Sequence, residues 1–308
     1  MSVRPTSRTP DEPASAAIRE RTIGILCGLG VVALFSGFTL VSRLGFSSSL
    51  TLPDIAALRF GIGGLLLLPI VLRHGLSGLS WRHAIALAFL GGLGFALFAY
   101  AGFSLAPAAH GAVLLHGTLP LFTFAITAAI PAAIPGRKAT PAKTLGVAMI
   151  TAGIVVMALD SLLGATAGQL LGDASLLLAS VCWASYGILA RRLGIPPARA
   201  ASVVAVLSMC CFLPIYLAMP GKALLSAGWH EILVQGVFQG VFIGAVSIFI
   251  YTRAVSALGA SETALFTAAV PCVTTIAAVP LLSEMPSTAG MIGVAVVTAG
   301  MVVAMRRA

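Results

Sequence analysis

The chain has 308 residues, of which 59% are hydrophobic and only 9% are charged, and its formal net charge is +9. A soluble domain of this size would have too little polar surface to face water, so the composition predicts a polytopic membrane protein. The basic residues lie between apolar runs, where the membrane surface accounts for them better than a nucleic acid does. We therefore expect membrane lipid, and no nucleic acid, as a partner.

The first 21 residues form a polar tail, and long apolar runs follow it. We expect residues 1–21, with four Arg and three Pro, to be a disordered cytosolic tail. The runs do not alternate apolar and polar residues, which excludes the strands of a membrane barrel. Charge-poor runs near 20 residues predict ten transmembrane helices. They cover residues 22–42, 54–72, 84–104, 108–130, 143–160, 170–190, 200–219, 232–252, 261–282 and 287–305.

The distribution of Lys and Arg predicts the orientation of these helices. With the N-terminus inside, fifteen basic residues fall on the cytosolic side, and only Arg43 and Lys222 fall outside. Such an excess satisfies the positive-inside rule, and it predicts that both termini are cytoplasmic. A wrong number of helices would scramble this asymmetry, so the charges also support ten.

The two halves of the chain resemble each other. Aligning Tyr100 with Tyr251 brings Pro120 onto Pro271 without a gap. Further on, "LGVAMITAGIVV" (145–156) matches "IGVAVVTAGMVV" (292–303) at eight of twelve positions. Five helices per half is an odd number, so the halves, 22–160 and 161–308, must be oppositely oriented. Inverted repeats are typical of secondary transporters, with the binding site near the midplane between the halves.

These features resemble the EamA family of the drug/metabolite transporter superfamily. The resemblance rests on "LRF" (58–60), Ala-Val-Pro (269–271), Leu-Ser-Glu (282–284), and Gly293 with Gly300. It implies an all-α integral membrane fold with ten transmembrane helices in two inverted five-helix repeats. It also implies transport of small metabolites, often by export. Two departures are Leu-Ser-Glu in place of the family's Leu-Gly-Glu, and "IPGRK" (134–138) in place of its first-half equivalent.

The aligned prolines predict a break in one helix of each half. Proline has no N–H, so Pro120 leaves the carbonyl of His116 without its helical partner, and Pro271 does the same to Thr267. Broken helices at matched positions predict hinges beside the binding site. We therefore predict that His116 lines the substrate cavity. The alternative is a neutral histidine bonded to a neighbouring helix. His110 is expected at the outer interface.

Two ionisable residues lie within or beside the predicted spans. Glu262 opens the ninth span, where it either complements the helix N-terminus or, together with His116, carries a coupled proton. Arg59 lies within the second span, where its stem could snorkel outward or its charge could pair with Asp54. A structural or gating role for Arg59 and contact with an anionic substrate group both remain open.

Aromatic and amide residues complete the predicted substrate site. Trp183 and Tyr186 are three residues apart on one helix face, and Tyr100 and Tyr251 are repeat mates. Together they could form an aromatic cage, although interfacial anchoring is an alternative for the two repeat mates. Gln239, with Gln235 one turn earlier, needs partners in lipid, so that face of its helix should point inward.

The sequence predicts a secondary transporter that exports an amino acid, an amine or a drug-like compound by alternating access. No P-loop, H-E-x-x-H or complete G-x-S-x-G motif occurs, and the cysteines lack metal spacing, so we expect no enzyme, cofactor or metal. A membrane-embedded enzyme such as an intramembrane protease is the alternative, and a channel is less favoured because buried charges are not repeated. The low number of Lys residues and the absence of Asn suggest a GC-rich bacterial genome. We therefore expect the protein in a bacterial inner membrane. We expect a monomer.

Overall fold

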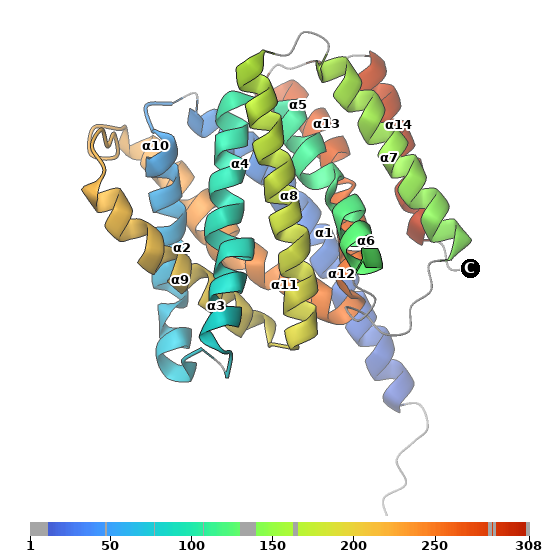
Figure 1. Cartoon of the computed structure of the whole chain (residues 1–308), viewed down its shortest axis with the longest axis horizontal. Coiled ribbons are helices and arrows are strands. Elements are labelled where there is room, and N and C mark those ends of the chain that lie inside the picture. Colours follow the sequence, from blue (N-terminus) through green and yellow to red (C-terminus); the bar gives the residue numbers. More distant parts are fainter. Residues whose placement is uncertain are drawn as a thin grey trace, which may run out of the picture.

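The structure of the protein is a computed structural model. It is a bundle of helices (Figure 1). The structure describes residues 12–46, 48–76, 78–106, 108–129, 140–162, 166–282, 285 and 288–305. The "IPGRK" segment and the Ser-Glu of 283–284, which the sequence singled out, lie outside these ranges. All regular structure in the described residues is helical, as predicted.

In the described residues each half contributes five long helical segments, which we call rods. Some of these rods consist of two or three consecutive helices. In the first half these are α1 (Glu12–Phe46), α2 (Leu52–His74), α3–η1–α4 (Trp81–Ala88, Phe89–Leu93, Gly94–Leu105), α5–η2–α6 (Ala108–His110, Gly111–Gly117, Leu119–Ala129) and α7 (Pro141–Leu162). In the second half they are α8 (Ala167–Leu193), α9 (Pro197–Ala218), α10–η4–α11 (Trp229–Gln235, Gly236–Val246, Ser247–Leu258), α12–α13 (Ala260–Thr267, Val270–Leu282) and α14 (Thr288–Met305). The η pieces are π-helical.

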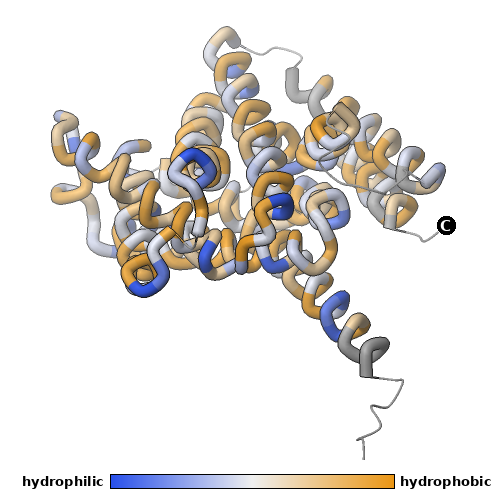
Figure 2. Tube along the Cα trace, turned by 60° about the horizontal axis from the view of Figure 1, so that its bottom comes forward, coloured by the Kyte–Doolittle hydropathy of each residue, from blue (hydrophilic) through white to orange (hydrophobic). Residues whose placement is uncertain are grey.

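Eight of the described helical segments are long and apolar enough to cross a membrane. Two more apolar stretches, Thr144–Val156 in α7 and Thr288–Ala304 in α14, are shorter. Together these ten segments match the ten predicted spans. Hydrophobic residues run along the helices, and hydrophilic ones gather toward their ends (Figure 2).

The first helix starts earlier than the sequence predicted. We expected disorder through residue 21, but α1 begins at Glu12. Pro13 lies in its first turn, where proline is tolerated, and the alanines, Glu and Arg that follow favour helix. The hydropathy pattern marks where the apolar part of a helix begins, and a polar extension of the same helix is invisible to it.

The packing of α7 against α14 shows the two-fold relation of the halves. In the sequence alignment Gly146 corresponds to Gly293, and Gly153 to Gly300. In the structure a Cβ added to Gly146 would lie 2.6 Å from the carbonyl oxygen of Gly300, and one added to Gly153 would lie 2.8 Å from that of Gly293. Each contact is the other with the halves exchanged, as two-fold symmetry requires. The small residues let the two backbones approach closely.

We predict that Gly153→Leu strongly destabilises the α7–α14 pair. A Cβ there would lie 2.8 Å from the Gly293 carbonyl oxygen and 2.9 Å from the Val297 backbone nitrogen, so the helices must separate. Overpacking of this kind costs about 1–3 kcal/mol. The melting temperature of the detergent-purified protein measures it. Gly168→Leu is the control, because its Cβ would have no neighbour nearer than 3.9 Å. Equal melting temperatures for the two variants would contradict the close packing.

The other helices pair across the halves in the same way. The rods α2 and α9, which are repeat mates, pack on each other, as do α4 with α8 and α1 with α11. The α7–α14 pair lies at one side of the bundle, and α2 with α9 at the other (Figure 1). The centre is therefore enclosed by helices from both halves.

Candidate functional site

A cluster of aromatic rings fills the centre of the bundle. Helices of the first half supply Phe35, Phe38, Phe95, Tyr100 and His116, and helices of the second half supply Trp183, Tyr186 and Tyr251. Each of these side chains is at most 2% exposed. We call these eight residues the central aromatic cluster. Sequence reasoning predicted five of them and missed the three phenylalanines, which no pattern distinguishes from core residues.

Trp183 lies at the junction between the halves. Its ring centroid is 4.4 Å from that of Phe95 in α4 and 4.9 Å from that of Tyr251 in α11. Tyr186 follows one turn later, with its centroid 5.2 Å from Trp183. The indole Nε1 of Trp183 is buried and makes no hydrogen bond with the described residues. A buried N–H without a partner is unfavourable, so this donor is available to a ligand.

His116 stacks on Phe35 with ring centroids 4.9 Å apart. Its Nε2 is buried and has no hydrogen-bond partner among the described residues. The alternative that the sequence left open, a neutral histidine hydrogen-bonded to a neighbouring helix, is therefore not realised at Nε2 within the described residues. The ring occupies the first half's side of the cluster and presents an unpaired nitrogen there.

The helix that carries His116 is interrupted, as Pro120 predicted. The π-helical η2 ends at Gly117, and α6 begins at Leu119. The carbonyl of His116 is not left without a partner, because the N–H of Thr118 contacts it within the turn. In the second half α12 ends at Thr267 and α13 begins at Val270, so the break recurs at the matched position.

The two breaks lie against each other. A Cβ on Gly117 would meet the Cγ of Pro271 at 3.2 Å, so the broken helices touch where each is interrupted. Irregular backbone inside a membrane is tolerated where protein or a water-filled cavity surrounds it. The contact brings the two interruptions together, and both predicted hinge prolines, Pro120 and Pro271, are buried.

Arg59 is buried in the same region, with 1% of its surface exposed. Its guanidinium carbon lies 5.2 Å from the centroid of Phe38, 5.6 Å from Phe95 and 5.9 Å from Tyr100. The Tyr100 hydroxyl interacts with the guanidinium group both electrostatically and by side-chain hydrogen bonding. The two terminal nitrogens of Arg59 have no hydrogen-bond partner among the described residues. Snorkelling was therefore a wrong expectation.

The possible ion pair of Arg59 with Asp54, which a separation of five residues did not favour, does not form. The Asp54 carboxylate accepts hydrogen bonds from Thr51 at the start of α2, from the Tyr216 hydroxyl at 2.6 Å and from the Ala223 backbone N–H at 3.2 Å. Five residues of helix separate the two positions by about 7.5 Å along the axis. These hydrogen bonds hold the Asp54 carboxylate at the N-terminus of α2. The Arg59 charge therefore has no carboxylate beside it among the described residues.

A hydrogen-bonded chain joins three helices beside the cluster. The Tyr100 hydroxyl donates to the Gln239 Oε1 at 3.0 Å, and the Gln239 Nε2 donates to the Ser42 hydroxyl at 3.0 Å. Gln235 donates to the carbonyl of Val41. The two amides point inward, as expected. Interfacial anchoring is wrong for Tyr100 and Tyr251, which are both fully enclosed.

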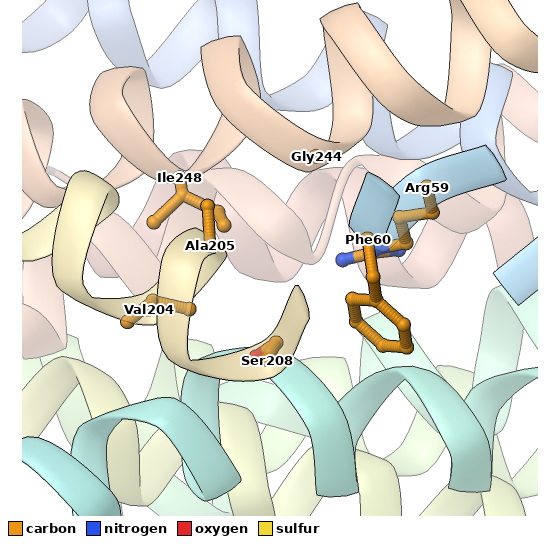
Figure 3. Close-up of a pocket in the computed structure, with 8 residues that line it drawn as sticks. Arg59, Phe60, Val204, Ala205, Ser208, Gly244 and Ile248 are labelled. Carbon is orange, nitrogen blue, oxygen red and sulfur yellow. The ribbon is translucent and has the colours of Figure 1, made fainter. Parts of the chain in front are cut away.

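Two small cavities adjoin this region. One, of about 10 Å³, is lined by Arg59, Phe60, Gly92, Val204, Ala205, Ser208, Gly244 and Ile248. Arg59 reaches it from α2, between α9 and the η4–α11 rod (Figure 3). The other, of about 170 Å³, lies at the carboxyl ends of α8 and α11 and includes Thr252 in its lining. Thr252 is hydrogen-bonded to Tyr186 at 2.6 Å, so this cavity borders the cluster.

Glu262 lies apart from the cluster. It is half-buried in the first turn of α12, five residues and about 7.5 Å along the axis before Thr267. The N-cap residue of α12 is Gly259, and no side chain caps the helix there.

The buried pair that His110 and Asp173 form was not predicted from the sequence. The Asp173 Oδ1 lies 2.6 Å from the His110 Nδ1, and both residues are at most 6% exposed. His110 is therefore inside the bundle, where we had expected it at the interface. Asp173 lies near the start of α8, so it reads from sequence as a helix-terminal acid. Only the position of α8 beside α5 and η2 reveals the pair.

Comparisons with known proteins agree with this architecture. The model of the EamA-like transporter family matches residues 22–159 and again residues 170–306. A solved structure, titled only as a crystal structure of protein, has a TM-score of 0.66 and 23% identity, and covers 92% of this chain and 98% of that one. That likeness shows the fold alone. A search of curated proteins found no match. Because the family matches both halves, the chain is a multi-pass membrane protein that belongs to the EamA-like transporter family.

Proposed function

We propose that the protein is a secondary transporter that exports a small metabolite, such as an amino acid, an amine or a drug-like compound, by alternating access. The observation that carries the proposal is the central aromatic cluster, which is built by both halves and holds unpaired nitrogens of His116 and Trp183. Binding near the midplane between inverted repeats lets a rocking motion expose one site to either side.

The arrangement of contacts supports loading from the cytosol. With the predicted orientation, the Asp54–Tyr216 contact and the hydrogen bond from Ser49 to Glu231 lie at the outer end, where they hold helices of the two halves together. The larger cavity lies at the inner end and stops at the Tyr186–Thr252 hydrogen bond. That bond joins two helices of the second half, and the Arg253–Glu20 ion pair, at 2.7 Å, is a contact between the halves that opening towards the cytosol must break.

The breaks at Pro120 and Pro271 act in this proposal as the hinges about which the halves move. The close approach of Gly117 to Pro271 couples a bend in one half to a bend in the other. Glu262 and His116 are the candidates for carrying a coupled proton. The proposal places the protein in a bacterial inner membrane, with both termini in the cytoplasm.

Transport of an unaltered compound tests this function. Proteoliposomes are incubated with a small-molecule extract of bacterial cells, washed, and their contents identified by mass spectrometry. We expect at least one compound to accumulate only when the protein is present, with its mass unchanged. Release of chemically altered compounds would favour the membrane-embedded enzyme, such as an intramembrane protease. Ion conductance in a planar bilayer would favour a channel.

Cysteine labelling tests the predicted orientation. Ala198 lies in the first turn of α9, at the predicted inner end. Leu225 is 98% exposed in the predicted outer loop between α9 and α10. In a variant with the five native cysteines replaced by Ala, a membrane-impermeant maleimide should label Leu225→Cys on intact cells. Ala198→Cys should react only after permeabilisation. The reverse pattern would invert the topology and with it the assignment of the larger cavity to the cytosol.

A further inference from the structure

Four buried nitrogens of Arg59 and of the central aromatic cluster have no hydrogen-bond partner among the described residues. They are the two terminal nitrogens of Arg59, the Nε1 of Trp183 and the Nε2 of His116. The first three are donors in every protonation state, and the histidine nitrogen is a donor in one tautomer. A partner for these nitrogens must therefore carry hydrogen-bond acceptors.

The charge at this site is positive and uncompensated. Arg59 is buried, and no other Arg or Lys whose burial the structure describes is buried. Of the two buried acids in the described residues, Asp54 is bonded to Thr51, Tyr216 and Ala223, and Asp173 to His110. A buried guanidinium without a counterion is strongly unfavourable, and ring faces offset only part of that.

The surroundings of Arg59 define the shape of the partner. Ring faces of Phe38, Phe95 and Tyr100 lie within 5.9 Å of the guanidinium carbon, and the cavity beside it has room for about one water molecule. A planar carboxylate fits the fork of a guanidinium through two parallel hydrogen bonds. The remainder of the ligand would lie among aromatic rings, which suits an apolar body.

We propose that Arg59 is the anion-binding residue of the transport site and that the substrate is a small organic carboxylate with an apolar body and a net negative charge. This inference rests on the proposed function. It narrows the substrate to acids, because an amine would add a second cation beside Arg59, and a zwitterion would bring no net negative charge to offset the guanidinium. The ligand enters when the halves open, since the described conformation encloses the site.

Matched probes separate charge from shape. The full chain, purified in detergent at low salt, is melted with 3-phenylpropionate, 3-phenylpropionamide, phenylalanine, hexanoate, hexanamide, and inorganic phosphate or sulfate. We expect each carboxylate to raise the melting temperature more than its amide. A ligand present at about 100 times its dissociation constant stabilises measurably. Equal stabilisation by the amides, by phenylalanine or by the inorganic anions overturns the proposal, as does a panel without any carboxylate effect.

Substitutions at Arg59 then assign the effect to one residue. Arg59→Met removes the buried cation, so the ligand-free variant should melt at or above the wild-type temperature while the carboxylate effect disappears. Arg59→Lys keeps the charge without the fork, and should weaken carboxylate binding about 10- to 100-fold while keeping the preference for acid over amide. Arg43→Met is the control, because Arg43 lies at the outer end of α1.

The outcomes distinguish this inference from the proposed function. A carboxylate effect that persists in Arg59→Met overturns the role of Arg59. If the accumulated compound of the proteoliposome experiment is neutral or cationic, transport stands and the carboxylate assignment falls. If nothing accumulates while carboxylates bind through Arg59, the transport proposal fails and the anion site stands.

Discussion

His116→Ala should lower transport at least about fivefold while leaving the amount of folded protein unchanged. The substitution removes the stacking contact with Phe35 and the unpaired Nε2 that the interrupted helix presents to the cluster. Stacked pairs contribute about 0.5–1.5 kcal/mol and a hydrogen bond to a ligand about as much again, which together correspond to roughly 5- to 150-fold. The flux of the compound identified in proteoliposomes is the measurement.

His230→Ala is the matched control for that experiment. His230 is exposed in the first turn of α10 and should be replaceable without loss of flux. Wild-type flux in His116→Ala would remove the histidine from both the substrate site and the proton pathway. A loss of flux together with loss of folded protein would point instead to the packing of the broken helix, which size-exclusion chromatography of the variant detects.

Asp173→Ala should destabilise the protein by about 3–5 kcal/mol. The substitution leaves the imidazole of His110 buried, with its Nδ1 deprived of the oxygen that lies 2.6 Å away. Removing one member of a buried ionic pair is costly, because the remaining polar group stays desolvated and unpaired. The melting temperature in detergent, compared with wild type, is the measurement.

A double variant distinguishes the effect of leaving one polar group unpaired from the effect of losing side-chain volume. Replacing both His110 and Asp173 by Leu should recover most of the stability lost in Asp173→Ala, because no unpaired group remains. Glu231→Ala is the surface control. Glu231 accepts a hydrogen bond from Ser49 at an exposed position, where a polar contact contributes at most about 1 kcal/mol. If Asp173→Ala melts like Glu231→Ala, the pair is not a stabilising contact.

Several features of the site followed from local sequence. Pro120 and Pro271 interrupt their helices, because a missing N–H acts on the turn that contains it, whatever surrounds it. The two Gln side chains of the η4 region point inward, since an amide cannot remain unpaired in lipid. The glycines of α7 and α14 allow close approach through their size alone.

Other features depended on neighbours that the sequence does not name. Tyr100 and Tyr251 lie at the ends of apolar runs, so they resemble interfacial anchors until α1 and α8 are seen to cover them. Asp54 lies five residues before Arg59, a poor spacing for an ion pair, and only the structure shows that Tyr216, 162 residues away, binds its carboxylate. The Asp173–His110 pair joins the two halves, and neither residue carries a local sign of the other.

The sequence by itself determined the membrane class, the ten helices, the inverted repeat and the positions of the breaks. Hydropathy, charge asymmetry and proline each act through the helix that contains them, and a repeat is visible as self-similarity. Only the tertiary structure decided that Arg59 lies unpaired among aromatic rings, because the rotation and tilt of each helix are set by packing against the opposite half. The chemistry of the site arises from that packing.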